Sequence, residues 1–225
     1  MKQITVLLAE DHEIVREGFR CLLKHERDIQ VVGEAATGRQ AVQLTRKLRP
    51  AVVVMDIAMP LLNGLEATRQ IRKDCPDTKV LILSAHSDDA YVEQVAALGA
   101  AGFLLKQTSS HVLATAIREI QKGNTFFSPL VSKRLQNRSQ KLTDQGNLSK
   151  TASNRLSSRE VEVLQLIAEG KPNKQVAAEL GVTFKTVDKH RQHLMAKLNI
   201  HDTAGLTRYA ISAGIIESSV QVTII

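Results

Sequence analysis

The chain has no tryptophan and only two cysteines, and aromatic residues make up just 3% of its 225 residues. Cys21 and Cys75 have neither the spacing of a zinc site nor that of a disulfide framework, and fit a reducing compartment with buried or inert thiols. No apolar run approaches the roughly 20 residues that span a bilayer. The first apolar run is short and ends in acids, unlike a signal peptide. We therefore expect a cytoplasmic protein with an aliphatic core.

Charge is distributed unevenly along the chain, whose net charge is +7. Residues 1–122 hold 16 basic and 15 acidic residues. Residues 123–154 hold five basic residues and one acidic residue, and residues 155–225 hold nine basic and seven acidic residues. The basic excess lies in the second half. This half is therefore expected to bind an anionic partner.

Short apolar runs alternate with amphipathic segments through residues 1–122. Strands are predicted at 4–10, 29–35, 52–56, 79–84 and 102–105. Helices are predicted at 13–25, 38–49, 64–75, 90–98 and 109–122. Five such units with short loops indicate an α/β fold, a doubly wound, flavodoxin-like parallel sheet of five strands with helices on both faces.

Polar residues follow four of these strands. Glu10 and Asp11 end the first strand, Asp56 the third, Ser84 the fourth and Lys106 the fifth. The carboxyl ends of parallel strands share one edge of the sheet, where open α/β sheets bind their ligands. Clustered carboxylates suit Mg²⁺, and a lysine suits a phosphoryl group. The spacing predicts a phosphate-accepting aspartate, although Lys106 or Ser84 alone would more often be an ordinary surface or turn residue.

The second half changes from a polar, basic stretch to a helical pattern. Residues 128–154 are predicted to be linker with one short helix near 130–135. Ser157 and Glu160 form a capping box that opens a helix ending at Gly170. Helices are then predicted at about 173–180, 184–198 and 203–213. The tight turn at Gly181, followed by Thr183 as N-cap, indicates a helix-turn-helix.

The predicted 184–198 helix has two different faces. Val187, Leu194 and Leu198 fall on one side, at a spacing that fits 3.6 residues per turn. The other side carries Lys185, Asp188, Lys189 and Gln192. A recognition helix presents such side chains to DNA near its N-terminus. The alternative is a solvated helix face without a partner.

The chain resembles a two-component response regulator of the NarL/FixJ class, in which a receiver domain precedes a LuxR-type helix-turn-helix. The first half is similar to a receiver through LLAEDHEIVREGF, VVVMDIAMPLLNGLEA, VLILSAH and GAAGFLLK. The second is similar to a LuxR-type domain through LSSREVEVLQLIAEGKPNKQVAAELGVTFKTVDKHRQHLMAKL. The resemblance implies a receiver at 1–122, a linker at 123–154 and a small all-α DNA-binding domain at 155–216. It also implies a transcriptional regulator and not an enzyme.

The resemblance assigns roles in the first half residue by residue. Asp56 would accept a phosphoryl group from a sensor histidine kinase. Asp11, Asp56 and the carbonyl of Ala58 would bind Mg²⁺, with Glu10 supporting it through water. Ser84 and Lys106 would contact the phosphoryl group, and Phe103 would follow Ser84 inward. Phenylalanine has no hydroxyl, so that inward state would depend on packing alone.

In the second half, the resemblance gives base or backbone contacts to Lys185, Asp188, Lys189 and Gln192. Phosphate contacts are expected from Lys171, Lys174, Thr186, His190 and Lys197. His190 has packing as an equal alternative, and Asp188 can either accept from cytosine or pair with a neighbouring lysine. The apolar stripe at 203–213 would form a homodimer interface on phosphorylation or simply pack within its own domain. RNA polymerase is a further candidate partner.

Three other functions compete with this one. A phosphohydrolase of the haloacid-dehalogenase kind needs a general acid two residues after the nucleophile, where this chain has Ala58. An interaction protein that does not bind DNA would not need a basic outer helix face. A regulator that works without phosphate would not need the complete set of acids, serine and lysine.

Overall fold

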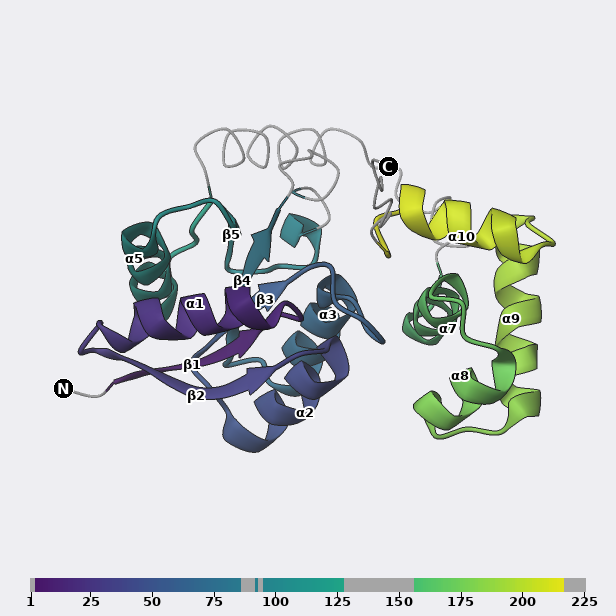
Figure 1. Cartoon of the computed structure of the whole chain (residues 1–225), viewed down its shortest axis with the longest axis horizontal. Helices are drawn as coiled ribbons and strands as arrows, with labels where there is room; N and C mark the ends of the chain where they lie inside the picture. Colours follow the sequence, from purple (N-terminus) through teal and green to yellow (C-terminus); the bar gives the residue numbers. More distant parts are fainter. Residues whose placement is uncertain (1–2, 86–91, 93–94, 128–155, 217–225) are drawn as a thin grey trace, which may run out of the picture. The chain divides into compact units, whose positions relative to one another are not determined.

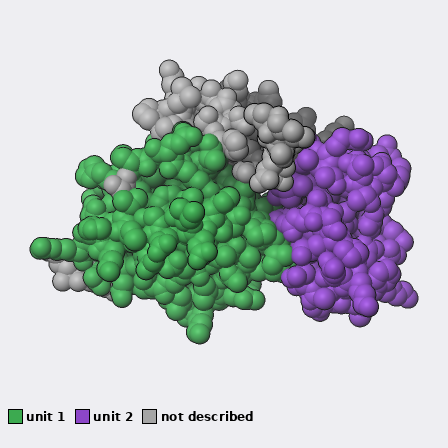
Figure 2. Space-filling view, in the orientation of Figure 1, with its two compact units in different colours: residues 1–148 green, residues 149–225 purple. Residues whose placement is uncertain are grey.

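The computed structural model describes residues 3–85, 92, 95–127 and 156–216 of a chain that forms two compact units, Met1–Leu148 and Ser149–Ile225 (Figure 2). Among the described residues, the first unit holds a parallel sheet of five strands in the order β2-β1-β3-β4-β5. The strands are β1 (Ile4–Ala9), β2 (Ile29–Ala35), β3 (Val52–Asp56), β4 (Lys79–Ser84) and β5 (Gly102–Leu105). The strand order reverses between β1 and β3, which is where open α/β sheets form a crevice at their carboxyl edge.

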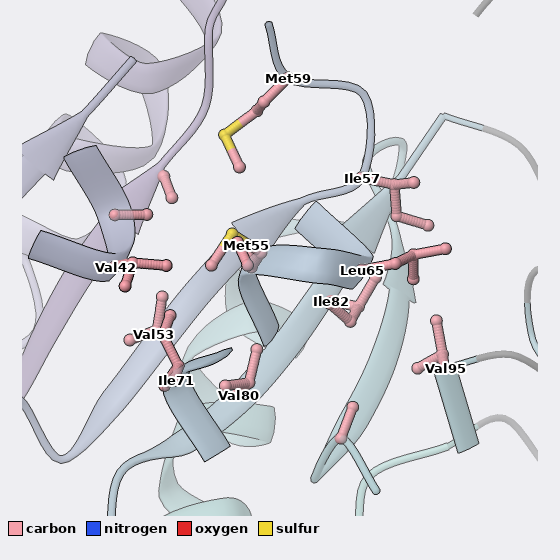
Figure 3. Packing of buried hydrophobic residues seen from close by; sticks show 14 of the residues in the cluster. Val42, Val53, Met55, Ile57, Met59, Leu65, Ile71, Val80, Ile82 and Val95 are labelled. Atoms are coloured by element: carbon pink, nitrogen blue, oxygen red, sulfur yellow. The ribbon is translucent and has the colours of Figure 1, made fainter. Parts of the chain in front are cut away.

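Helices cover both faces of this sheet (Figure 1). One face is covered by α1 (Glu13–Lys24) and α5 (Ser110–Gln121), and the other by α2 (Gly38–Leu48) and α3 (Gly64–Asp74). Within β3, Val53 and Met55 pack among the residues of α2 and α3 (Figure 3), whereas Val52 and Val54 pack toward α1 and α5. Burial on both faces explains why β3 is a continuous apolar run and does not alternate with polar residues.

The predicted α/β fold is confirmed, and the five strands and these four helices each end within one residue of the predicted positions. The predicted helix at 90–98 begins outside the described residues, although residues 92 and 95–97 are helical. The predicted short helix near 130–135 and most of the predicted linker also lie outside them. Residues just beyond α5 stay on the sheet, because Phe126 N donates to Ala101 O and Phe103 N donates to Phe126 O, both at 2.9 Å.

The described part of the second unit consists of four helices around a core of its own. They are α7 (Ser158–Ala168), α8 (Asn173–Leu180), α9 (Phe184–Leu198) and α10 (Thr203–Ser212). The core includes the buried residues Val163, Leu164, Leu166, Ile167, Val176, Leu180, Val187, Leu194, Leu206 and Ala210. The capping box of Ser157 and Glu160 is present, and Gly181 turns the chain between α8 and α9 with a φ of 63°. This α8–turn–α9 arrangement confirms the predicted helix-turn-helix.

Two expectations from composition can be compared with the structure. Cys75 is buried, whereas Cys21 is exposed on α1. Within the described ranges, none of the helices is both long enough and apolar enough to cross a membrane.

Candidate functional site

Three strands bring charged side chains to one edge of the sheet. Asp56 is the last residue of β3, Glu10 follows β1 and Lys106 follows β5. Lys106 Nζ lies 3.0 Å from Asp56 Oδ1 and 2.8 Å from Glu10 Oε2. The backbone of Lys106 continues the pairing of β5 with β4, since its N–H donates to Ser84 O at 2.8 Å. The sheet register therefore holds an ammonium against two carboxylates.

The loop after β3 folds tightly behind Asp56. Gly64 N donates to Ile57 O at 2.8 Å, and a Cβ atom at Gly64 would lie 1.8 Å from Asp56 O. Only glycine fits so close to this carbonyl. Asn63 Oδ1 caps α3 by accepting from Glu66 N at 2.9 Å, so the loop ends in a fixed helix start. Ala58 lies in this loop, two residues after Asp56 and partly exposed.

The acid pair after β1 has a neighbour that the sequence patterns did not indicate. His12 Nδ1 lies 3.1 Å from Glu10 Oε1 and 3.1 Å from Asp11 Oδ1. Its only signal in the sequence was its position directly after the two acids. Arg16 holds the same segment, because its Nη1 donates to Glu10 O at 2.7 Å. Glu10, Asp11 and His12 thus form a compact group that could hold a metal ion.

Asp56 is buried in a way that disfavours its charge. Its carboxylate accepts from Ile57 N through Oδ1 at 2.9 Å, whereas Oδ2 is buried and has no hydrogen-bond partner. Burial and the nearby Glu10 carboxylate raise the pKa of Asp56 to about 7, although Lys106 acts in the opposite direction. Burial lowers the pKa of Lys106, but its pairing with Asp56 and Glu10 outweighs that and leaves the pKa raised. The unpartnered oxygen and the crowded negative charge fit a cation or a covalent partner at this point.

Ser84 lies on β4, the strand next to β3, and Phe103 lies on β5, the strand beyond β4. Ser84 is the buried last residue of β4, one residue beyond Leu83, which pairs with Asp56 in the sheet. Phe103 lies on β5 and is buried in the cluster that also contains Val95. Both are therefore close in the sheet to the acidic edge, and Phe103 is held by apolar packing.

The outer face of α9 presents polar side chains from successive turns. Lys185, Lys189 and Gln192 are exposed, whereas Val187 and Leu194 are buried against the rest of the unit. Gln192 Nε2 donates to Asp188 Oδ2 at 3.0 Å. Asp188 therefore pairs with Gln192 and not with Lys185 or Lys189. This bond orients both side chains on the exposed face.

A hollow of about 550 Å³ lies beside the first turns of α9. Its lining consists of Thr183, Lys185, Thr186, Lys189, His190 and His193. Two lysines and two threonine hydroxyls line the hollow, which makes it suitable for an anionic group such as a phosphate. His190 is half-buried here. His193 was not among the predicted residues, because position alone did not distinguish it from a solvated side chain.

Two cations of α9 hold the helix in its unit. Arg191 donates to Asn173 Oδ1 at 3.2 Å and to Thr203 Oγ1 at 2.7 Å, so it joins α9 to α8 and α10. Lys197 Nζ lies 2.7 Å from the buried Glu160 Oε2 of α7. Lys197, which we predicted as a phosphate contact, thus has a partner inside the unit.

The two remaining predicted lysines differ in their exposure. Lys174, in the first turn of α8, is exposed, whereas Lys171 is partly buried with its Nζ 3.9 Å from Glu179 Oε1.

On α10, Leu206 and Ala210 are completely buried, and this helix packs against α7. Packing within the unit therefore accounts for the centre of the apolar stripe of α10.

Two family models match the chain, one on each unit. Residues 6–118 match the response regulator receiver domain. Residues 154–210 match the bacterial regulatory proteins of the luxR family. Between them, the two matches include most of β1, all of β2 to β5 and the α8–turn–α9 arrangement.

Similar proteins contain both parts. The oxygen regulatory protein NreC of Staphylococcus epidermidis is 38% identical over 215 residues, which cover 94% of this chain and 99% of NreC. The response regulator protein VraR of Staphylococcus aureus is 36% identical over 214 residues, which cover 95% of this chain and 99% of VraR. Among solved structures, the RcsB response regulator of Salmonella typhimurium is 28% identical with a TM-score of 0.60, covering 95% and 99%. A complex of RcsB with DNA is similar at 28% identity and a TM-score of 0.56, covering 94% and 99%. The chain belongs to the two-component response regulators that join a receiver domain to a luxR-family DNA-binding domain.

Proposed function

We propose that Asp56 accepts a phosphoryl group from a sensor histidine kinase and that this modification controls DNA binding by α9. The observation that carries the proposal is the Asp56 carboxylate, buried beside Lys106 with its second oxygen unpartnered. In the transfer, a carboxylate oxygen attacks phosphorus, a P–O bond forms, and the P–N bond of the phosphohistidine breaks with the electron pair leaving on the imidazole. Lys106 neutralises charge on the transferred group.

Magnesium fits the donors at this edge. The three carboxylates of Glu10, Asp11 and Asp56 are hard oxygen ligands, and the orphaned Oδ2 of Asp56 is one that a cation would satisfy. Asp11, Asp56 and the carbonyl of Ala58 would hold the ion, and Glu10 would support it through water. When bound, Mg²⁺ neutralises the negative charge that the phosphoryl group brings to the carboxylates.

Phosphorylation adds charge at the carboxyl edge, and two neighbouring residues carry the response. Ser84 donates its hydroxyl to the phosphoryl group, and Phe103 repacks inward with it. This change biases the part of the receiver around residues 95–98 and β5 and favours a homodimer. The proposed boundaries are 1–122 for the receiver, 123–154 for the linker and 155–216 for the DNA-binding domain. The protein acts in the cytoplasm as a regulator without turning over a substrate, and RNA polymerase is its candidate partner at promoters.

For DNA, α9 lies in the major groove. Lys185, Asp188, Lys189 and Gln192 contact base edges or the adjacent backbone, which is supported by their common side of the helix and by the Gln192–Asp188 hydrogen bond. Phosphate contacts come from Lys171, Lys174, Thr186 and His190, with Lys197 the weakest candidate because it pairs with Glu160.

Phosphate uptake tests the acceptor. Incubation with acetyl phosphate and Mg²⁺ should phosphorylate the wild type once per chain, because acetate is a good leaving group. Asp56→Asn should take up none at that rate, since an amide is a poor nucleophile. Asp77→Asn, which changes an exposed acid in a loop, is the matched control and should react like the wild type. Uptake by Asp56→Asn at the wild-type rate would show that another residue is the acceptor.

A further inference from the structure

Phe184 exposes most of a large apolar side chain at the start of α9. It is the first residue of α9 and 57% of its surface is exposed. In the described part of the second unit, Ile211 is the other large apolar residue left exposed, at 38%. Phenylalanine is a poorer helix former than alanine, and an aromatic ring in water gains nothing from packing. The exposed part of the ring is therefore free to contact a partner outside the unit.

The helix start on which Phe184 stands is fixed. Thr183 Oγ1 accepts from Thr186 N at 3.2 Å, and the hydroxyls of these two threonines lie 2.9 Å apart. These bonds set the position of the first turn of α9. The N-terminal residues of a recognition helix are those that reach base edges.

Phe184 also belongs to a row of side chains on α9. Asp188 and Gln192 follow it at intervals of four residues, which brings all three onto one side of the helix. Successive members are about 6 Å apart along the axis. Gln192 donates to Asp188 at 3.0 Å, so the last two members form a fixed polar pair. The row therefore presents an apolar ring first, then an acceptor, then an amide.

We propose that Phe184 is a specificity residue that packs on the 5-methyl group of a thymine in the major groove, one helical turn before the bases faced by Asp188 and Gln192. This proposal rests on the proposed binding of DNA by α9. The phenyl ring has no donor or acceptor and cannot distinguish bases by hydrogen bonds. The thymine methyl is the apolar group on a base edge in the major groove, and aromatic side chains contact it there. Lys185, the next residue, supplies the charge that holds this end of the helix near the backbone.

The test measures how strongly DNA binding depends on the methyl group of each thymine in a binding site. A binding site is selected from random DNA with the full-length chain treated with acetyl phosphate, and each thymine of a half-site is then replaced by deoxyuridine. For the wild type, one replacement should weaken binding roughly fourfold, the effect of about one buried methyl group. Phe184→Ala should bind the thymine and deoxyuridine forms of that position equally. Ile211→Ala, the matched loss of an exposed apolar side chain, should keep the wild-type dependence.

Two results would overturn the proposal. One is a wild type that tolerates deoxyuridine at every position, a result that needs no variant to fold. The other is Phe184→Ala that keeps the same loss at the same thymine, with an unchanged unfolding midpoint. A different result would show that α9 does not bind DNA at all. The wild type would then show no salt-dependent binding to any DNA, and both the proposed DNA binding and the proposed role of Phe184 would be wrong.

Discussion

Lys106 Nζ lies 3.0 Å from Asp56 Oδ1, so the residue after β5 supplies the cation for the last residue of β3. This single cation does not offset the surroundings of Asp56. Burial and the Glu10 carboxylate still raise the pKa of Asp56 to about 7. The acidic edge is thus a place where the fold gives up stability to keep a reactive group.

The first prediction concerns the stability that the folded chain loses because Asp56 is buried beside another carboxylate. In the folded state the pKa of Asp56 is about 7, above its ordinary value of 3.8, so stability falls as pH rises through this window. Asparagine carries no charge at any pH, so the Asp56→Asn variant does not lose stability in this way as pH rises. Without metal, Asp56→Asn should raise the free energy of unfolding by about 2–4 kcal/mol near pH 8, and the gain should shrink toward about pH 4. Urea unfolding in EDTA measures it. A gain that does not change with pH, or that Asp77→Asn reproduces, would argue against this cause.

The second prediction concerns Mg²⁺. Because the ion binds the folded site, Mg²⁺ at about ten times its dissociation constant should stabilise the wild type by roughly 1.4 kcal/mol. Asp11→Ala should lose most of this gain and should also take up phosphate from acetyl phosphate more slowly. Thermal unfolding with and without Mg²⁺ gives the first quantity, and phosphate uptake over time gives the second. Equal stabilisation of Asp11→Ala and wild type would remove Asp11 from the ligand set.

Local patterns were sufficient to predict the fold and the acidic edge. The strand ends are visible because β3 and β4 are buried on both faces and read as apolar runs that stop at Asp56 and Ser84. Parallel pairing then brings those ends together without any knowledge of distances. The helix-turn-helix was equally visible, since Ser157, Gly181 and Thr183 act within a few residues of their own positions.

Contacts between distant residues could not be predicted in the same way. Glu160 and Lys197 are 37 positions apart, and nothing near either residue indicates the other. Arg191 likewise joins three helices through polar atoms that carry no periodic signal. The partner of Asp188 was local but ambiguous, because lysines and Gln192 were all within reach on the same helix. Such choices depend on side-chain geometry and not on sequence spacing.

The third prediction separates folding from DNA contact at Lys197. Lys197→Met should destabilise the second unit by about 1–2 kcal/mol, because it leaves the buried carboxylate of Glu160 without its cation. Burial acts to raise the pKa of Glu160, but bonds from Lys197 and Ser157 outweigh it and leave the pKa lowered, so the effect should fade as pH drops below about 4.5. Lys174→Met, a change at an exposed lysine, is the control for unfolding measurements. A stable Lys197→Met variant with a reduced salt slope on DNA would instead favour a phosphate contact.

The fourth prediction separates base reading from phosphate binding. Gln192→Ala and Lys189→Ala should each change the preferred sequence by roughly 1–3 kcal/mol at one base pair. Lys174→Ala should weaken all sequences about equally and lower the salt slope by roughly one. Binding to selected and random duplexes at several salt concentrations distinguishes them. Equal losses on both duplexes for Gln192→Ala and Lys189→Ala would exclude base reading by these two residues.

The fifth prediction concerns how the two halves are coupled. The second unit has its own buried core, including Leu164, Val187 and Leu206, so a fragment from Arg155 to Ile225 should fold alone. If the receiver covers the DNA-binding face, this fragment should bind DNA without phosphate and more tightly than the unphosphorylated full chain. The predicted linker at 123–154 is long enough to allow docking and release. A domain that is free about 1% of the time would gain up to roughly a hundredfold on release.

Dimer contacts would obscure this comparison, because a fragment without the receiver loses any that the receiver provides. Single half-sites avoid the difficulty, since one monomer fills them. Circular dichroism of the fragment checks that it is folded, and binding is then compared among the fragment, the full chain and the full chain treated with acetyl phosphate. With masking, the fragment and the treated chain should bind a half-site alike and the untreated chain more weakly. If all three bind the half-site equally and differ only on paired sites, phosphorylation acts through dimerisation and the receiver does not cover α9.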